Sequence, residues 1–268
     1  MKERIDLWDS VEQIPGYTGA SDGFRPYMDL YLLEDAPQPA PCVVVLPGGG
    51  YCFVSVENEG SSICEMLNAA GYSAVMVNYR VAPYTYPCMV LDAQRAIRTV
   101  RYRAAEWNVD PDKIGTIGFS AGGHLCCMTG LLFDDGKPDG DEIDAVSCRP
   151  NTVAPCYAVT TFDGIATHGG TRQNFFGRVP TEEEAAAFSS ENMIRPDAPP
   201  FFLWHTATDD CVSVECSLRL ASALAKHGVP CETHIFPYGG HGLGVAKSDD
   251  LACRWTRLYV EWLDHYNR

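Results

Sequence analysis

Two rhythms of apolar and polar residues alternate along this chain. Short apolar or alternating runs predict strands, whereas longer segments with apolar residues every three or four positions predict helices. The predicted strands are residues 27–33, 42–46, 73–78, 113–119, 153–160, 201–205 and 232–236. The predicted helices are residues 61–70, 89–107, 124–132, 214–226 and 249–264. Strands and helices therefore take turns along most of the sequence.

This alternation predicts an α/β fold. Strands that alternate with helices of this length need crossover connections, which make the sheet mostly parallel and place helices on both faces. In such sheets, functional groups gather at the carboxyl ends of the strands. No repeat, low-complexity tract or linker divides the chain, so residues 1–268 are expected to form a single domain. Residues 134–144 are rich in Asp and Gly, and 167–188 lack a clear strand, so a small lid or flap is expected within 134–188.

Composition narrows the classes of function. With 268 residues, 46% of them hydrophobic, the chain is long enough for a full core. A net charge of -15 opposes binding to nucleic acid or to anionic membranes, which attract basic surfaces. No run reaches the ~18 apolar residues of a membrane helix, and the first nine residues lack the apolar segment of a signal peptide. A cytoplasmic location is therefore expected.

Twelve cysteines are scattered along the chain, several of them inside apolar runs. No Cys-x-x-Cys or His-Glu-x-x-His pattern occurs, so the sequence predicts no metal site. Buried, reduced thiols are expected instead. We expect neither a metal ion nor an organic cofactor.

The segment Gly-Phe-Ser-Ala-Gly-Gly at residues 118–123 carries the first chemical signal. It lies between a predicted strand and a predicted helix, so Ser120 would stand at the tip of a sharp turn with its hydroxyl exposed. A Gly-x-Ser-x-Gly pattern alone arises by chance in roughly one chain in ten. The prediction of a nucleophile therefore depends on partners elsewhere in the chain.

A serine nucleophile needs a base, and His241 is the strongest candidate. It lies in the glycine loop 239–242, directly after the last predicted strand. His124 follows Ser120 by one helical turn, so local packing or capping is the better interpretation. His205 ends a strand beside the candidate acid loop and is expected to orient it. Structural roles are expected for His227, His234 and His265.

The base in turn needs a carboxylate. Two candidates, Asp209 and Asp210, follow the predicted strand 201–205. The spacing Asp-x-x-Val favours Asp209, because Val212 could anchor the loop while Asp209 points inward. Asp163, after the preceding strand, is a distant third candidate, and a turn-forming role before Gly164 is its alternative.

The oxyanion of an attacked carbonyl needs donors that are already in place. The N–H of Ala121, just after the nucleophile, is one of them. Another is expected from the loop Pro-Gly-Gly-Gly-Tyr at residues 47–51, where bare backbone can approach a substrate. A phosphate-binding interpretation of these glycines fails, because no Gly-Lys-Ser/Thr or Gly-x-Gly-x-x-Gly pattern is present.

From about residue 27 to the end, the chain resembles the esterase/lipase branch of the α/β-hydrolase fold. It is most similar to bacterial acetyl-xylan and feruloyl esterase-like enzymes. The matching segments are residues 46–51, 78–83, 118–124, 204–207 and 239–242. Relatives commonly have His where Pro47 stands, and Val-Pro where this chain has Val212 and Ser213.

The resemblance implies a catalytic triad of Ser120, Asp209 and His241. It also implies the oxyanion donors Gly49, Gly50 and Ala121. The implied reaction is hydrolysis of a carboxylic ester through an acyl-enzyme. Short acyl groups are favoured, especially acetyl groups on carbohydrates such as acetylated xylan oligosaccharides.

The substrate side leaves alternatives open. Tyr51 and Trp204 could offer aromatic surface for a sugar ring or could equally be core residues. A general short-chain carboxylesterase or lipase-like enzyme is the nearest alternative function. A serine peptidase and a non-catalytic binding protein on the same scaffold are the others. The sequence predicts no oligomeric state.

Overall fold

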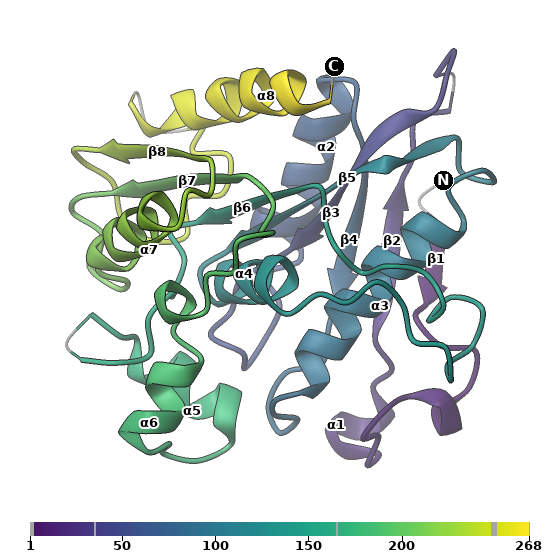
Figure 1. Cartoon of the computed structure of the whole chain (residues 1–268), viewed down its shortest axis with the longest axis horizontal. Helices are drawn as coiled ribbons and strands as arrows, with labels where there is room; N and C mark the ends of the chain where they lie inside the picture. Colours follow the sequence, from purple (N-terminus) through teal and green to yellow (C-terminus); the bar gives the residue numbers. More distant parts are fainter. Residues whose placement is uncertain (1–2, 35, 165, 248–250, 268) are drawn as a thin grey trace.

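The central element of the protein is a single twisted sheet. The computed structural model describes residues 3–34, 36–164, 166–247 and 251–267. Within them, eight strands pair in the order β1-β2-β4-β3-β5-β6-β7-β8 (Figure 1). Their bounds are β1 (Glu3–Asp6), β2 (Tyr27–Tyr31), β3 (Ala40–Leu46), β4 (Ser73–Asn78), β5 (Val109–Phe119), β6 (Thr152–Cys156), β7 (Phe201–Thr206) and β8 (Cys231–Phe236).

Strand direction divides the sheet into two parts. The pairs β1–β2 and β2–β4 are antiparallel, whereas every pair from β4 to β8 is parallel. In the middle, Val44 of β3 aligns with Val75 of β4 and with Thr116 of β5. Because helices cover both faces there, the central strands are buried apolar runs. The predicted mostly parallel sheet is confirmed.

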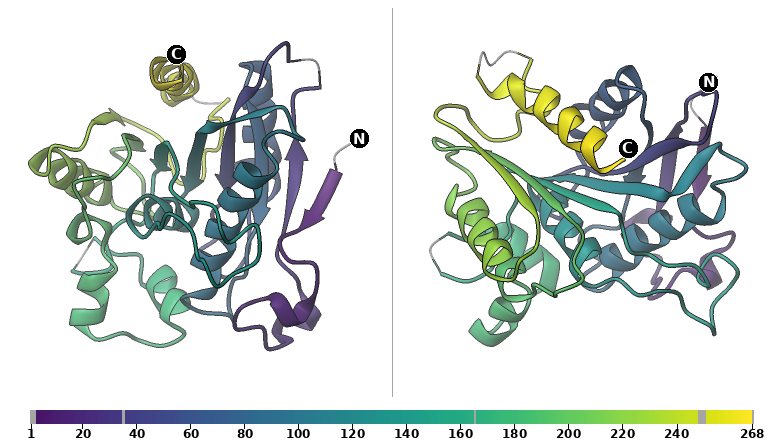
Figure 2. Two further views of the ribbon diagram at one scale, coloured as in Figure 1. Left: turned by 45° about the vertical axis from the view of Figure 1, so that its right-hand side comes forward. Right: turned by 45° about the horizontal axis from the view of Figure 1, so that its top comes forward.

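Five helices cover the two faces of this sheet. The helices α3 (Cys88–Tyr102), α4 (Ala121–Leu131) and α7 (Glu215–Lys226) share one apolar cluster with the sheet. The helices α2 (Ser62–Ala69) and α8 (Trp255–Tyr266) share the cluster on the opposite face. Figure 2 shows α8 separated from α3 and α4 by the sheet. None of the described helices is long and apolar enough to cross a membrane.

Short elements fill the connections. They are α1 (Ala20–Gly23), α5 (Gly169–Phe176), α6 (Glu182–Ala187), the 3-10 turns η1 (Val11–Gln13), η3 (Ser190–Asn192) and η4 (Ala252–Arg254), and the π-helical turn η2 (Glu57–Ser61). In Figure 1, α5 and α6 lie side by side below the sheet. Both belong to the segment in which a lid or flap was expected.

Several boundaries differ from the sequence prediction. β5 begins at Val109 rather than at residue 113, because Val109 pairs with Ala40 before an irregularity in the ladder. β6 ends at Cys156, since the backbone turns at Tyr157 with φ 33°. α3 ends at Tyr102 rather than at residue 107. The predicted start of the last helix, residue 249, lies outside the described residues.

Candidate active site

Ser120 occupies the turn between β5 and α4. Its backbone has φ 53° and ψ -120°, a conformation that is uncommon and strained for a residue other than glycine. The strand and the helix pass so closely that a Cβ atom on Gly118 would lie 2.1 Å from the carbonyl oxygen of Gly122. Small residues are therefore required on both sides of Ser120, as the sequence predicts. The serine itself keeps 9% of its surface exposed.

The structure brings Ser120, His241 and Asp209 into one chain of hydrogen bonds. Ser120 Oγ lies 2.8 Å from His241 Nε2, and His241 Nδ1 lies 2.8 Å from Asp209 Oδ2. Because a carboxylate oxygen only accepts, Nδ1 donates to Asp209. In the neutral imidazole, Nε2 is then free to accept the serine proton. The geometry is that of a nucleophile, a base and an orienting acid.

Asp209 is held from several sides. Its Oδ1 accepts the backbone N–H groups of Cys211 and Val212, each at 2.9 Å, while His205 Nε2 lies 3.3 Å from Oδ2. Burial by itself would raise the pKa of Asp209. The hydrogen bonds from His205, His241 and Val212 outweigh burial and lower that pKa below its ordinary value. Asp209 is therefore an anion at neutral pH.

The same contacts test the expectations about this loop. Val212 is 1% exposed and anchors the loop, as the Asp-x-x-Val spacing predicts. His205 Nε2 donates to the carbonyl of Val212 at 3.0 Å, so His205 orients the acid loop as expected. Asp210 is exposed, and Asp163 pairs with Arg219 at 3.2 Å. Of the three candidate acids, the structure places Asp209 against His241.

The glycine loop after β3 lies next to the serine. A Cβ atom on Gly48 would approach Ser120 Cβ to 3.0 Å. At Gly49, φ is 133° and a Cβ would meet the carbonyl oxygen of Phe53 at 2.1 Å, so only glycine fits there. Among the described residues, no hydrogen bond uses the N–H groups of Gly49, Gly50 or Ala121. These three donors remain available to a substrate oxygen.

Two side chains that sequence reasoning missed hold this loop. Tyr79 donates its hydroxyl to the carbonyl of Pro47 at 2.5 Å, so a tyrosine from the segment after β4 braces the loop. The buried carboxylate of Glu59 accepts the N–H of Gly48 at 2.9 Å. Tyr79 lies in the matching segment 78–83, which could have drawn attention to it. No spacing pattern connects Glu59 with the site.

The segment with α5 also reaches the site. Asn174 donates its side-chain amide to the carbonyl of Gly50 at 2.8 Å. At the start of α5, His168 Nδ1 accepts the N–H of Thr171 at 3.2 Å and lies 2.8 Å from its hydroxyl. Burial lowers the pKa of His168, and the neighbouring His241 lowers it further. His168 is thus a second histidine beside the site, and the sequence offered no signal for it.

The predicted sugar-stacking role of Tyr51 and Trp204 is not supported. Both side chains are 0% exposed, so neither offers a ring face to a substrate. Tyr51 forms a 2.9 Å hydrogen bond with His124, and Trp204 stacks on Trp255 with ring centroids 5.0 Å apart. His124 packs locally, as expected, and burial lowers its pKa to about 4. Both aromatic residues are core residues, the alternative that the sequence left open.

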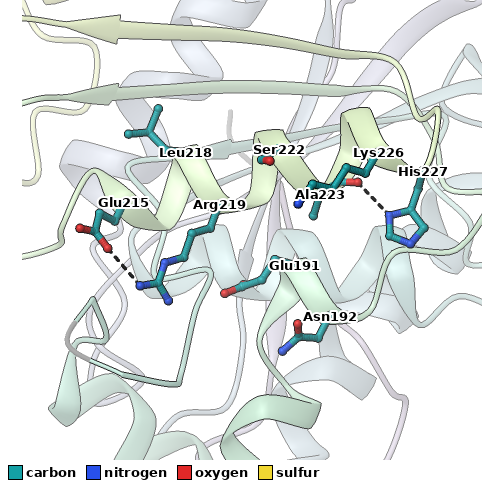
Figure 3. A pocket seen from close by; sticks show the side chains of 9 residues that line it. All are labelled: Glu191, Asn192, Glu215, Leu218, Arg219, Ser222, Ala223, Lys226 and His227. Atoms are coloured by element: carbon teal, nitrogen blue, oxygen red, sulfur yellow. Dashed lines mark hydrogen bonds and ion pairs between the residues drawn. The ribbon is translucent and has the colours of Figure 1, made fainter.

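A hollow of about 560 Å³ lies elsewhere, between α7 and η3 (Figure 3). Figure 3 shows Glu215 paired with Arg219, and the ring of His227 bonded to the carbonyl of Ala223, all within α7 and its end. Its lining residues are Glu191, Asn192, Glu215, Leu218, Arg219, Ser222, Ala223, Lys226 and His227. None of these is a predicted site residue, so we place the chemistry at Ser120 and not here.

Across the described residues, no three His, Cys, Asp or Glu side chains are grouped so that they could hold a metal ion. Most thiols lie in the core, as expected; the buried ones include Cys42, Cys126, Cys127, Cys148, Cys156 and Cys216. Cys52 and Cys211 are exposed.

Comparisons with known proteins give consistent matches. A sequence model of the protein family described as BD-FAE matches residues 28–224. The endo-1,4-beta-xylanase B of Butyrivibrio fibrisolvens is 35% identical over 259 residues, which cover 94% of this chain and 39% of that protein. The acetylxylan esterase of Xylanibacter ruminicola is 30% identical over 228 residues, which cover 84% of this chain and 45% of that protein. The chain therefore spans less than half the length of these two relatives.

A solved structure matches over nearly its whole length. The crystal structure of the acetyl ester-xyloside bifunctional hydrolase from Caldicellulosiruptor lactoaceticus superposes with a TM-score of 0.94 at 42% sequence identity. The match covers 99% of this chain and 96% of that chain. The whole arrangement of sheet and helices is therefore shared with that hydrolase.

Proposed function

The chain belongs to the BD-FAE family, and from this premise we propose that it is a serine carboxylic ester hydrolase that works through an acyl-enzyme. The observation that carries the proposal is the hydrogen-bonded chain from Ser120 through His241 to Asp209. The N–H groups of Gly49, Gly50 and Ala121, which make no hydrogen bond within the described residues, support it as oxyanion donors. A binding protein on this scaffold would have no need for such an aligned set of groups.

In the proposed first half-reaction, Ser120 attacks the ester carbonyl carbon. His241 Nε2 takes the hydroxyl proton as the new carbon–oxygen bond forms. The oxyanion lies on the backbone N–H groups of Gly49, Gly50 and Ala121, and Asp209 stabilises the imidazolium. His241 then gives its proton to the leaving alcohol, and the acyl group stays on Ser120.

The second half-reaction repeats these steps with water. His241 removes a proton from water, whose oxygen attacks the acyl carbon while the same donors hold the oxyanion. The bond to Ser120 Oγ breaks, the serine regains its proton from His241, and the carboxylic acid leaves. The original Ser120 proton has left with the alcohol and is replaced by one from water, so the cycle consumes only water besides the ester.

We propose short acyl esters of carbohydrates, such as acetylated xylan oligosaccharides, as the substrate class. The support is chemical kinship: one relative is an acetylxylan esterase, and the structural neighbour is an acetyl ester-xyloside hydrolase. A general short-chain carboxylesterase is the alternative that the experiment below separates. The triad and the oxyanion loop follow the carboxyl ends of strands in one sheet, which supports the proposal that residues 1–268 act as one domain.

Within residues 134–188, we propose α5 as the flap over the site. Asn174 ties it to Gly50, and His168 places a second imidazole beside His241. Phe175 fixes its other side, since its ring packs 5.5 Å from that of Tyr51 and 5.4 Å from that of Phe162. The flap is therefore anchored by aromatic contacts to the core and covers the oxyanion loop as a fixed wall.

The test is a rate series on p-nitrophenyl acetate, butyrate and octanoate, together with acetate release from acetylated xylo-oligosaccharides. The proposal expects the acetate ester to react fastest and the oligosaccharides to release acetate. A preference for octanoate would contradict the short-acyl part. Activity on acetate esters without acetate from the oligosaccharides would leave a general carboxylesterase.

A further inference from the structure

The turn η2 contacts the two loops that carry catalytic groups, the oxyanion loop of residues 47–51 and the histidine loop of residues 239–244. From this turn, Glu59 accepts the N–H of Gly48 at 2.9 Å through Oε2 and the hydroxyl of Tyr157 at 2.7 Å through Oε1. The Glu59 residue is only 4% exposed. One buried group therefore holds the oxyanion loop with one oxygen and Tyr157 with the other. The mechanism above makes no use of it.

Tyr157 extends this contact to the histidine loop. Its hydroxyl oxygen accepts the N–H of Gly244 at 3.0 Å. Its ring packs edge-on against the imidazole of His241, with centroids 5.1 Å apart and planes at 71°. The neighbour of Glu59, Asn58, donates its amide to the carbonyl of Gly242 at 2.7 Å. Through these hydrogen bonds, the turn η2 fixes the histidine loop and the oxyanion loop relative to each other.

The hydrogen-bond pattern indicates that Glu59 is ionised. The Tyr157 hydroxyl oxygen accepts a hydrogen bond from the Gly244 N–H, so its own hydroxyl proton is directed to Glu59. With a donor on each oxygen, the carboxyl group has no acceptor for a proton of its own. Burial raises the pKa of Glu59, while the bonds from Tyr157 and Gly48 and the nearby His241 oppose that rise.

Among the described titratable groups that face Glu59, only His241 can carry a positive charge opposite its carboxylate. Tyr157, Tyr79 and Cys156 face Glu59, and burial raises the pKa of each, which keeps all three neutral at neutral pH. His241 itself is faced by Asp209, His168 and Glu59. Glu59 is therefore a second anion beside the catalytic imidazole, in addition to Asp209.

We propose that Glu59 is a positioning residue for the ester hydrolysis, on whose proposed function this inference rests. Its carboxylate sets the distance between the oxyanion donors and His241. Its charge also favours the imidazolium that forms as Ser120 attacks. Both effects act in the transition state, so they belong in kcat more than in KM.

The test compares Glu59→Gln with wild type on p-nitrophenyl acetate. A glutamine keeps the shape but offers one oxygen, so either Gly48 N–H or the Tyr157 hydroxyl meets an amide NH₂ group. We expect kcat to fall by about 10–100-fold, somewhat less than on deletion of an oxyanion donor, with KM changed by less than about threefold. The acid limb of the kcat/KM profile should move to lower pH, because a buried anion near the catalytic imidazole is gone.

Glu191→Gln is the matched control. Glu191 lines the hollow of Figure 3, and burial raises its pKa as well. The Glu191→Gln variant should keep the kcat and the pH profile of wild type. A folded Glu59→Gln protein with wild-type kcat and an unshifted acid limb would overturn the proposal. A shift of the limb by Glu191→Gln as large as that by Glu59→Gln would overturn it as well.

Glu59→Asp decides the case if Glu59→Gln does not fold. Aspartate keeps the charge but draws the oxygens back by one methylene group, so kcat should fall while the acid limb stays in place. Unchanged kcat in folded Glu59→Asp contradicts the positioning role. Failure of the proposed function is a different result: wild type would then hydrolyse no ester at all.

Discussion

Replacing Asp209 by Asn tests the role of the acid through the contacts that surround it. Oδ1 accepts two backbone N–H groups, from Cys211 and Val212. An asparagine must keep its oxygen at that position, because an NH₂ group there would face two donors. Its NH₂ group then lies where Oδ2 stood, 2.8 Å from His241 Nδ1. His241 is driven into the tautomer with the proton on Nε2, which cannot accept the proton of Ser120.

The expected loss is therefore that of a wrong tautomer, about 10⁴-fold in kcat. The assay is p-nitrophenyl acetate hydrolysis at pH 7, with a thermal melt to verify folding. Asp210→Asn is the control: its side chain is exposed, so its kcat should stay within about twofold of wild type. A loss below tenfold in Asp209→Asn, or equal losses in the two variants, would refute the reasoning.

Three further predictions concern stability and substrate. Folding lowers the pKa of Asp209, so its carboxylate stabilises the folded state fully above the unfolded pKa of about 3.9 and loses this effect as pH falls through the folded pKa. The difference in unfolding free energy between wild type and Asp209→Asn should therefore shrink in denaturant titrations below pH 4. Gly118→Ala should lower the free energy of unfolding by about 3 kcal/mol and Tm by roughly 10 °C, because the added Cβ would lie 2.1 Å from the Gly122 carbonyl oxygen. Gly240→Ala, whose Cβ would enter open space, should leave Tm unchanged. His168→Leu should lower kcat/KM for acetylated xylo-oligosaccharides by about tenfold and leave kcat/KM for p-nitrophenyl acetate unchanged. The reason is that the Nε2–H of His168 can donate a hydrogen bond to a sugar hydroxyl near His241. Equal effects on both substrates would contradict that role.

The parts of the site that the sequence predicts are those fixed by local rules. Ser120 sits between a strand and a helix in a glycine-rich turn, and that pattern specifies its own geometry. Asp209 and His241 follow β7 and β8, which are neighbours in a parallel sheet, so the strand-end rule brings them together. The α/β fold with a mostly parallel sheet was predicted from the alternation of strands and helices and is confirmed, whereas the α/β-hydrolase fold was implied by the matching motifs.

Other features depend on packing that no local pattern encodes. Glu59 and Tyr157 meet across 98 residues, and His168 reaches the site only because Phe175 and Asn174 fix α5. For Tyr51, the residue type favoured a binding role that the packing does not allow. Its residue type suggests a sugar platform, but φ of 57° and a bond to His124 turn it into the core.

The whole mechanism depends on Ser120 being an activated nucleophile. The most direct measurement is labelling of the folded protein with a fluorophosphonate, followed by intact mass and peptide mapping. The account predicts one adduct per chain, on the peptide that contains Ser120, and no adduct in Ser120→Ala. An unreactive wild-type protein, or an adduct that persists in Ser120→Ala, would contradict it.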